Sequence, residues 1–302
     1  MKTNNGITGY IAGGLGNQLF ILAASWEQSH RLGCPLFLNT SYLEVSGLRE
    51  LELNQIDHPG IDIGSRGPWT SKKFPGNHIY PFPRSPKAVT GKLYFEKDQA
   101  KYDSKIHVVR PGTQLIGYFQ SARYFPTIAP QLHSLIEQSP LPPAEADYLD
   151  SLSERSCITL HLRRGDYQAE VNSGSVIASV DYARRAIALL RNLGNSDPIR
   201  VFSDSPEYIA QELGDLNEDI EIVDNSRLIS GIGTIRAMSL GSALIMSNSS
   251  FSWWAGWLME QRLPEKATVI SPRPWNESGT ARADMLYPTW MTLDARPHQL
   301  PS

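Results

Sequence analysis

Two adjacent arginines near the middle of the chain have the chemistry to bind an anion. Arg163 and Arg164 lie in the sequence HLRRGDY, which begins at His161 and follows an apolar run typical of a buried strand. A guanidinium group is always charged, and its planar fork matches the oxygens of a phosphate. Parallel sheets bind ligands at the carboxyl ends of their strands. The motif alone is equally compatible with a phosphate site and with a solvated loop that contains a local ion pair between arginine and Asp166.

A second motif carries small hydroxyl residues between a predicted strand and a predicted helix. It is the sequence NSSFSWW, which begins at Asn248 and contains Ser249, Ser250 and Phe251. Free amide groups and serine hydroxyls at a helix N-terminus form an anion site. Helix capping by the serines is the alternative. We expect the two tryptophans that follow to lie in the core, with stacking on a sugar as the other option.

A glycine-rich motif, GGLGNQ, stands near the start of the chain and begins at Gly13. Glycines between a strand and a helix allow backbone amides to approach an anion or a sugar closely. The motif is similar to a dinucleotide fingerprint, but Leu19 stands where the last glycine is expected. An NAD site is therefore disfavoured, and a tight turn remains the alternative to a ligand-binding loop.

Two aspartates follow predicted strands in the second half of the chain. Asp204 lies in the sequence SDSP, and Asp224 lies in IVDNS. A carboxylate can accept two parallel hydrogen bonds from N1–H and the amino group of guanine, whereas uracil offers no such pair. The alternatives are helix capping by Asp204 or Ser205 and turn formation by Asp224 and its neighbour Asn225.

Several function classes are disfavoured by what the sequence lacks. There is no Asp-x-Asp metal clamp, no HExxH, no Walker P-loop and no G-x-S-x-G elbow. The net charge of −3 argues against general nucleic-acid binding. Two distant cysteines, Cys34 and Cys157, favour reduced thiols over a disulfide or a zinc site. No apolar run has the length of a membrane span or a secretion signal, so we expect no transmembrane segment.

The alternation of apolar runs and helical patterns predicts two α/β domains. Strand, helix and strand patterns at residues 7–12, 17–31 and 35–39 indicate a parallel sheet, and 40–110 reads as loops and short strands. A strand is expected at 115–119, a helix at 124–138 and a boundary near 139–143. The predicted strands of the second half are 157–162, 199–202, 220–223, 243–246 and 268–270, and its helices are one capped by Asp181, then 205–213, 234–240 and 251–261. We expect Rossmann-type domains at 1–143 and 144–302, facing each other across a ligand cleft.

The motifs, in this order along the chain, resemble those of the α-1,2-fucosyltransferases of glycosyltransferase family 11. The sequences that carry the resemblance are GGLGNQLF, HLRRGDY, FSDSPEY, SNSSFSWWAGWL, VISPRPW and LYPTWMTL. The resemblance covers roughly residues 7–293 and is strongest from 157 to 275. It implies a GT-B-like fold, GDP-β-L-fucose as donor, and inverting transfer to O2 of a terminal galactose. Transfer with α-1,6 or protein O-linkage, or a GDP-sugar-binding protein without catalysis, are the alternatives.

The resemblance also implies roles for individual donor-site residues. Arg163 is expected to bind the diphosphate, with His161 and Arg164 supporting its loop. The donor set further comprises Asp204, Asp224, Ser249, Ser250, Phe251, Gly14 and Asn17. A guanidinium and helix-terminal amides would neutralise the leaving diphosphate in place of a divalent ion, so no metal and no other cofactor is expected.

The acceptor side is predicted from fewer residues. The N-terminal domain is expected to bind the galactose-terminated glycan through Gln18. Asp166 is the candidate general base and acceptor contact because it shares the arginine loop; a structural hydrogen bond is its alternative role. Animal relatives carry a membrane anchor that is absent here, which implies a bacterial, cytoplasmic enzyme with, at most, peripheral contact to the membrane.

Overall fold

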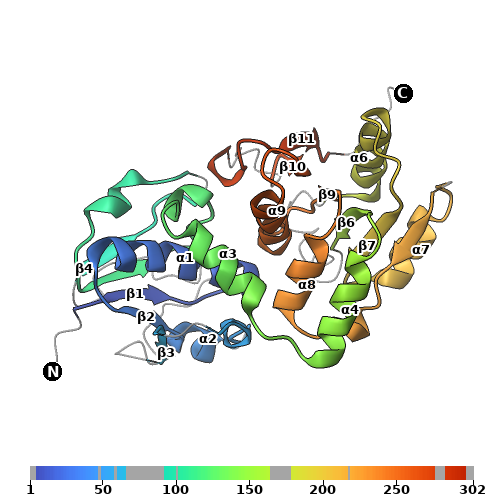
Figure 1. The fold of residues 1–302 in the computed structure, drawn as a ribbon. Coiled ribbons are helices and arrows are strands. Elements are labelled where there is room, and N and C mark those ends of the chain that lie inside the picture. The colour runs from blue at the N-terminus through green and yellow to red at the C-terminus, as the bar shows by residue number, and fades with distance from the viewer. Residues whose placement is uncertain are drawn as a thin grey trace. The chain divides into compact units, whose positions relative to one another are not determined.

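The chain forms two compact units (Figure 1). The structure, a computed structural model, describes residues 5–46, 49–57, 60–65, 92–99, 101–163, 178–216, 218–275 and 283–296. The first unit comprises Met1–Pro140 and Ala283–Met285, and the second comprises Leu141–Arg282 and Leu286–Ser302. Each unit is built on a parallel sheet with helices, which confirms the α/β class. The cleft between facing domains stays a prediction.

The first unit contains a five-stranded sheet in the order β3-β2-β1-β5-β4, with every adjacent pair parallel. Its elements are β1 (Ile7–Tyr10), α1 (Leu15–Leu32), β2 (Leu36–Asn39), α2 (Ser41–Ser46), η1 (Leu53–Gln55), β3 (Asp62–Gly64), β4 (Lys92–Phe95), η3 (Ser104–Val108), β5 (Thr113–Ile116), η4 (Ala122–Tyr124), α3 (Ala129–Gln138) and η7 (Ala283–Met285). The predicted strand, helix and strand at the start of the chain are confirmed as β1, α1 and β2.

Helix α1 packs on this sheet because apolar residues recur along it at helical spacing. Leu19, Leu22 and Ala23 are fully buried, as their spacing predicts. The helix ends at Gly33, whose φ of 58° is left-handed and whose amide donates to the carbonyls of Ser29 and His30. Glycine adopts this conformation without steric cost, so it terminates the helix and turns the chain into β2.

The second unit contains a six-stranded parallel sheet in the order β11-β10-β9-β6-β7-β8. Its elements are α4 (Pro143–Ser153), β6 (Ile158–Leu162), α6 (Val180–Asn192), β7 (Ile199–Ser203), α7 (Pro206–Leu213), β8 (Ile220–Ile222), η6 (Asn225–Arg227), α8 (Gly231–Met238), β9 (Ala243–Ile245), α9 (Ser250–Arg262), β10 (Thr268–Arg273) and β11 (Met291–Asp294). The chain runs outward from β6 to β8, returns to the other side of β6 and continues to β11. This is the strand order of a Rossmann domain, with its switch point between β6 and β9.

Helices cover both faces of the second sheet. Figure 1 shows α6 and α7 on one face and α4, α8 and α9 on the other. The three tryptophans of α9, at positions 253, 254 and 257, are almost completely buried and pack edge to face. The prediction that Trp253 and Trp254 lie in the core is confirmed, and a sugar-stacking role is wrong for both.

Four details of the predicted elements differ from the structure. Helix α6 is capped by Ser179, whose hydroxyl accepts from the Tyr182 amide, and Asp181 lies inside the first turn. Apolar residues at 186, 187, 190 and 193 predict one buried face, but Leu193 follows the helix and is 61% exposed, so it is not part of that face. Helix α3 begins only at Ala129, since the short helix η4 precedes it. Helix α4 and strand β11 were not predicted.

Candidate active site

The carboxyl edge of the second sheet brings several predicted site residues together at the switch point. His161 lies in β6, and Ser247 follows β9 on the neighbouring strand. The Nδ1 atom of His161 and the Oγ atom of Ser247 are 3.0 Å apart, so a hydrogen bond joins the ends of the two strands. Ligands of doubly wound sheets bind at this location. The arrangement places the arginine motif and the serine motif side by side.

The imidazole of His161 is buried beside a positive charge. Burial, and after it the guanidinium of Arg163, lower its pKa to about 4, although Asp204 opposes the shift. The ring is therefore neutral at neutral pH, and it can accept from or donate to Ser247 without carrying a charge. His161 thus holds the switch point together, and its support of the Arg163 loop stays a prediction.

Arg163 emerges directly after β6 and forms an ion pair with Asp204, the residue that follows the neighbouring strand β7. Its Nε atom lies 3.8 Å from Oδ2 of Asp204, and the two side chains are 30% and 36% exposed. The guanidinium thus lies at the carboxyl edge of the sheet, close to the end of β7.

The N-terminus of α9 provides the second anion-binding feature of this edge. Ser249 is the N-cap, and its hydroxyl oxygen accepts from the Phe251 amide at 3.2 Å. The capping alternative is therefore correct for Ser249, although the hydroxyl hydrogen can still donate to a ligand. Ser250 begins the helix, and Phe251 lies 6.2 Å from the His161 ring between centroids. The positive end of the helix dipole thus belongs to the same edge as Arg163.

Two residues of this edge, Ser247 and Asn248, were not assigned from the sequence. Asn248 accepts from the Ala178 amide at 3.1 Å and donates to the Trp275 carbonyl at 3.4 Å. It therefore fixes the segments after β10 and before α6 against the serine motif. The only feature of the sequence that could have indicated a role for Ser247 and Asn248 is their position directly after an apolar strand, because their hydrogen-bond partners lie far away in the sequence.

Asp224 lies farther along the same edge, after β8. Its Oδ1 atom accepts from the amide and the hydroxyl of Ser226, at 3.0 and 2.6 Å, and these bonds lower its pKa. The turn-forming alternative is thus correct for Asp224, which remains ionised and exposed. Asn225 donates to the Ser203 carbonyl at 2.6 Å and ties this turn to the end of β7. In the described part of the chain nothing donates to Oδ2 of Asp224, so that oxygen faces solvent.

The glycine motif of the first unit forms a tight turn at the carboxyl end of β1. Gly13 has a left-handed φ of +74°, and a Cβ there would lie 2.6 Å from Nδ2 of Asn17, so only glycine fits. Gly14 is the N-cap of α1, and the next amide, that of Leu15, donates to Oε2 of Glu52 at 2.9 Å. Asn17 accepts from Gln120 at 2.7 Å. The turn alternative is correct, and donor contacts by Gly14 and Asn17 stay predictions.

Gln18, the predicted acceptor contact, has a scaffolding position in the first unit. Its side chain is fully buried. The amide donates to the carbonyls of Gly13 and Glu50, both at 2.8 Å, and accepts from the Glu52 amide at 2.9 Å. These bonds occupy the side chain and hold residues 50–52 against the glycine motif. A direct contact of Gln18 with the acceptor stays a prediction.

Arg164 and Asp166 lie outside the described residues, and their predicted roles stay predictions. Among the residues that the structure describes, no group of three or more His, Cys, Asp or Glu side chains could hold a metal ion. Within the same residues, no helix combines the length and the hydropathy that crossing a membrane requires.

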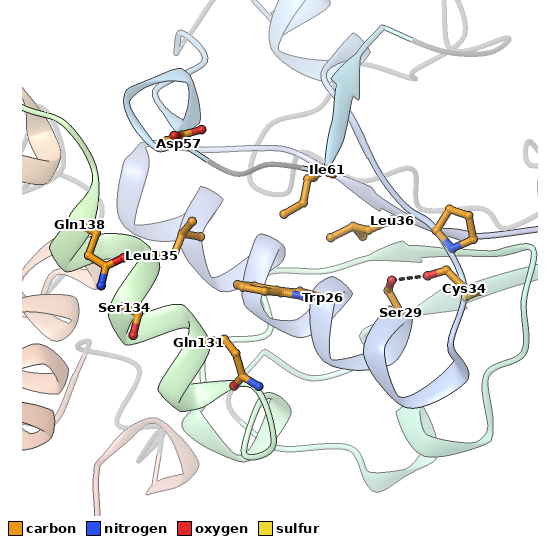
Figure 2. Close-up of a pocket in the computed structure, with 12 residues that line it drawn as sticks. Trp26, Ser29, Cys34, Leu36, Asp57, Ile61, Gln131, Ser134, Leu135 and Gln138 are labelled. Carbon is orange, nitrogen blue, oxygen red and sulfur yellow. Dashed lines mark hydrogen bonds between the residues drawn. The ribbon is translucent and has the colours of Figure 1, made fainter.

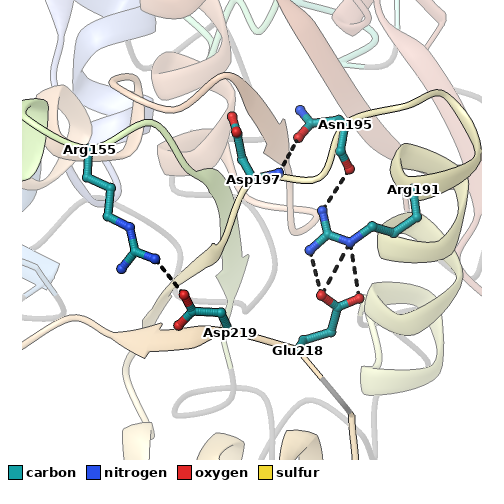
Figure 3. A network of polar contacts seen from close by, with 6 residues as sticks. All are labelled: Arg155, Arg191, Asn195, Asp197, Glu218 and Asp219. Atoms are coloured by element: carbon teal, nitrogen blue, oxygen red, sulfur yellow. Dashed lines mark hydrogen bonds and ion pairs between the residues drawn. The ribbon is translucent and has the colours of Figure 1, made fainter.

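The opposite, amino edge of the second sheet carries a separate ion-pair network (Figure 3). Arg191 pairs with Glu218 at 2.6 Å and donates to the Asn195 carbonyl, and Arg155 pairs with Asp219 at 2.5 Å. Arg155 precedes β6, Asn195 precedes β7, and Glu218 and Asp219 precede β8, while Arg191 lies in the last turn of α6. They hold the strand starts together, and they lie far from the switch point.

Comparison with known proteins places these features in a family. The family model described as "Glycosyl transferase family 11" matches residues 105–294, which is more than half of the chain. The chain belongs to glycosyl transferase family 11. The matched residues include every strand of the second sheet, together with the arginine motif and the serine motif at its switch point. The glycine motif lies before it.

Two Escherichia coli proteins are similar to this family 11 chain over most of its length. The protein named Alpha-1,2-colitosyltransferase is 28% identical over 282 residues, which cover 88% of this chain and 91% of the relative. The O-antigen biosynthesis glycosyltransferase WbnK is 27% identical over 315 residues, covering 94% and 99%.

Two kinds of solved structure are also similar to the family 11 chain. Fucosyltransferase NodZ from Bradyrhizobium matches with a TM-score of 0.46 and 15% identity, covering 83% of this chain and 92% of NodZ. POFUT1 in complex with GDP matches with a TM-score of 0.41 and 10% identity, covering 85% and 95%.

Proposed function

We propose that this family 11 glycosyltransferase transfers L-fucose from GDP-β-L-fucose to O2 of a terminal galactose, with inversion, forming Fucα1-2Gal. The observation that carries the proposal is the meeting of Arg163 and the α9 N-terminus at the switch point of the second sheet. This edge offers a guanidinium, helix-terminal amides and a serine hydroxyl to a diphosphate. Family membership supports glycosyl transfer, and the proposal adds the donor and the linkage.

The chemistry that this edge would perform is stabilisation of the leaving group. As the bond between fucose C1 and the β-phosphate oxygen breaks, negative charge grows on GDP. Arg163 and the amides at the start of α9 would neutralise this charge, in the role that a divalent ion has elsewhere. Removing one fixed donor of this kind raises a barrier by about 3–4 kcal/mol.

The donor nucleoside would lie along the same edge, toward β7 and β8. The exposed, ionised carboxylate of Asp224 would accept from N1–H and the amino group of guanine, and Asp204 would help to hold the nucleoside. In this assignment residues 144–302 form the donor domain, and residues 1–143 form the acceptor domain. Asp166 would take the proton of the galactose hydroxyl while its O2 atom bonds to fucose C1.

A colitosyl donor is the second candidate. It is favoured by the 28% identity to a protein named Alpha-1,2-colitosyltransferase over most of both chains. Colitose is fucose without the hydroxyl at C3, so both donors share the GDP group and the proposed leaving-group chemistry. Only contacts to that one hydroxyl would distinguish them.

The test is incubation of the protein with GDP-fucose or GDP-colitose and a panel of β-galactosides, followed by NMR analysis of the product linkage. Transfer of fucose to galactose O2 is the expected result. A product with another linkage, exclusive use of GDP-colitose, or GDP binding without turnover would each contradict the proposal in a different way.

Metal independence is tested in the same assay. GDP should bind equally well in EDTA and in Mg²⁺, because the proposed site neutralises the phosphates with protein groups. Loss of binding and transfer in EDTA, with recovery on addition of Mg²⁺, would contradict the role given to Arg163.

A further inference from the structure

The first unit contains a cavity that the proposed reaction does not use (Figure 2). Its volume is about 600 Å³, and it is formed by α1, α3 and the segments that lead into β2 and β3. Small-molecule sites in proteins commonly measure about 300–1,000 Å³. The cavity therefore has the size of a ligand site.

The cavity lies away from the edge that carries the glycine motif. Leu36 is the first residue of β2, and Ile61 directly precedes β3, so both mark the amino edge of the sheet. Trp26 belongs to the second half of α1, whereas Gly14 precedes the first residue of that helix. The cavity and the glycine motif are thus at opposite ends of α1.

The floor of the cavity is apolar. It consists of the Trp26 indole together with Leu36, Ile61 and Leu135. Figure 2 shows the indole lying below Leu36 and Ile61, with Leu135 beside it. Trp26 stays partly exposed, whereas Leu19, Phe20, Ile21 and Leu22 on the same helix are buried. A flat aromatic surface open to a cavity can stack against the C–H face of a sugar ring.

One wall of the cavity is polar. Gln131, Ser134 and Gln138 are spaced along one face of α3, and burial of Leu132 and Ile136 in the core fixes the rotation of that helix. Glutamine amides and serine hydroxyls can both donate and accept. No described residue forms a hydrogen bond with any of these three side chains. Their hydrogen-bonding capacity is thus available to a ligand.

The charge of the lining excludes other ligand classes. The described lining residues include the carboxylate of Asp57 and no Lys, Arg or His. A nucleotide or a phospholipid headgroup would be repelled by this carboxylate and would meet no cation among the described lining residues. A purely apolar ligand would leave the polar wall unused. A neutral, polyhydroxylated molecule can pack against the apolar floor and form hydrogen bonds with the polar wall.

We propose that this cavity is a binding site for a neutral oligosaccharide, separate from the site of transfer. One sugar ring stacks on Trp26, and its hydroxyl groups bond to Gln131, Gln138 and Asp57. The site would hold a remote part of a long glycan on the first unit. This inference does not depend on which sugar the enzyme transfers.

The experiment is an NMR titration of the full chain, labelled with 15N-tryptophan, with a neutral β-galactoside oligosaccharide and no donor. The indole N–H signal of Trp26 is assigned by its loss in Trp26→Phe. We expect this signal to shift with a millimolar Kd. The double variant Gln131→Ala, Gln138→Ala should weaken binding about tenfold, since hydrogen bonds to the ligand are lost.

Gln211→Ala is the matched control, because it makes the same change at an exposed position of α7. It should leave the Kd unchanged. A Trp26 signal that does not move, or the same Kd in the double variant, would overturn the proposal, as would a shift caused by a dodecyl detergent and not by the saccharide. The titration contains no donor, so its result stays separate from any failure of the transfer reaction.

Discussion

Replacing His161 tests the electrostatics of the switch point most directly. Its pKa is about 4 in the folded protein against 6.5 for an unperturbed histidine, because burial and the charge of Arg163 oppose protonation. The unfolded chain therefore binds the proton first as the pH falls. The stability that neutral His161 contributes is complete above pH 6.5 and is lost as the pH falls toward 4.

The magnitude follows from the two pKa values. The full difference corresponds to about 3 kcal/mol, and linkage gives a loss of about 2 kcal/mol between pH 7.5 and pH 5. His161→Asn removes the titrating ring and keeps a polar group near the position of Nδ1. The free energy of unfolding of this variant should fall about 2 kcal/mol less over that interval than that of the wild type.

The assay is urea denaturation at several pH values, with NMR titration of the His161 ring as a direct check. His30→Asn, which changes an exposed histidine at the end of α1, should retain most of the wild-type loss. Arg163→Met should shrink the loss, because removing the guanidinium raises the pKa of His161. Parallel pH profiles for the wild type and His161→Asn would refute the reasoning.

Three further predictions concern the donor site and its scaffold. Arg163→Ala should lower kcat/KM about 10²- to 10³-fold, whereas Arg191→Ala, at the opposite edge of the sheet, should leave turnover near the wild-type value; near-normal activity of Arg163→Ala would refute the leaving-group role. Asp224→Ala should weaken GDP binding roughly tenfold in calorimetry and leave UDP binding almost unchanged; an equal loss for both nucleotides would remove Asp224 from guanine recognition. Gln18→Ala should lower the free energy of unfolding by about 2–3 kcal/mol, since it removes three hydrogen bonds between the buried side chain and the backbone; an unchanged urea midpoint would contradict the scaffolding position.

Much of the second sheet could be predicted from the sequence because its signals are local. Strands β6, β7, β8 and β9 are short apolar runs, each followed by polar residues and a helical pattern. Helix capping is also a local feature, but the pattern alone cannot decide between two possible N-cap residues that lie within three positions of each other. The sequence therefore predicted α6 correctly, while its cap was assigned to Asp181 and not to Ser179.

The contacts that determine side-chain roles at the site are non-local, and the sequence contains no signal for them. His161 and Ser247 are 86 residues apart along the chain, and Gln18 is bonded to residues more than 30 positions away. The side chain of a polar residue in a glycine-rich motif could equally well contact solvent, a ligand or the protein backbone. Only the packing of residues 50–52 against α1 decides that Gln18 is buried and that Glu52 accepts from the first turn of α1.

The carboxyl edge of the second sheet is assembled from separate stretches of chain that follow β6, β7, β8 and β9. Each stretch is anchored by its own strand, so one can be exchanged without rebuilding the others or the core. Transplanting a single stretch between relatives is therefore a practical route to altered sugar-nucleotide preference. The same arrangement means that no short proteolytic fragment of the chain retains the complete edge.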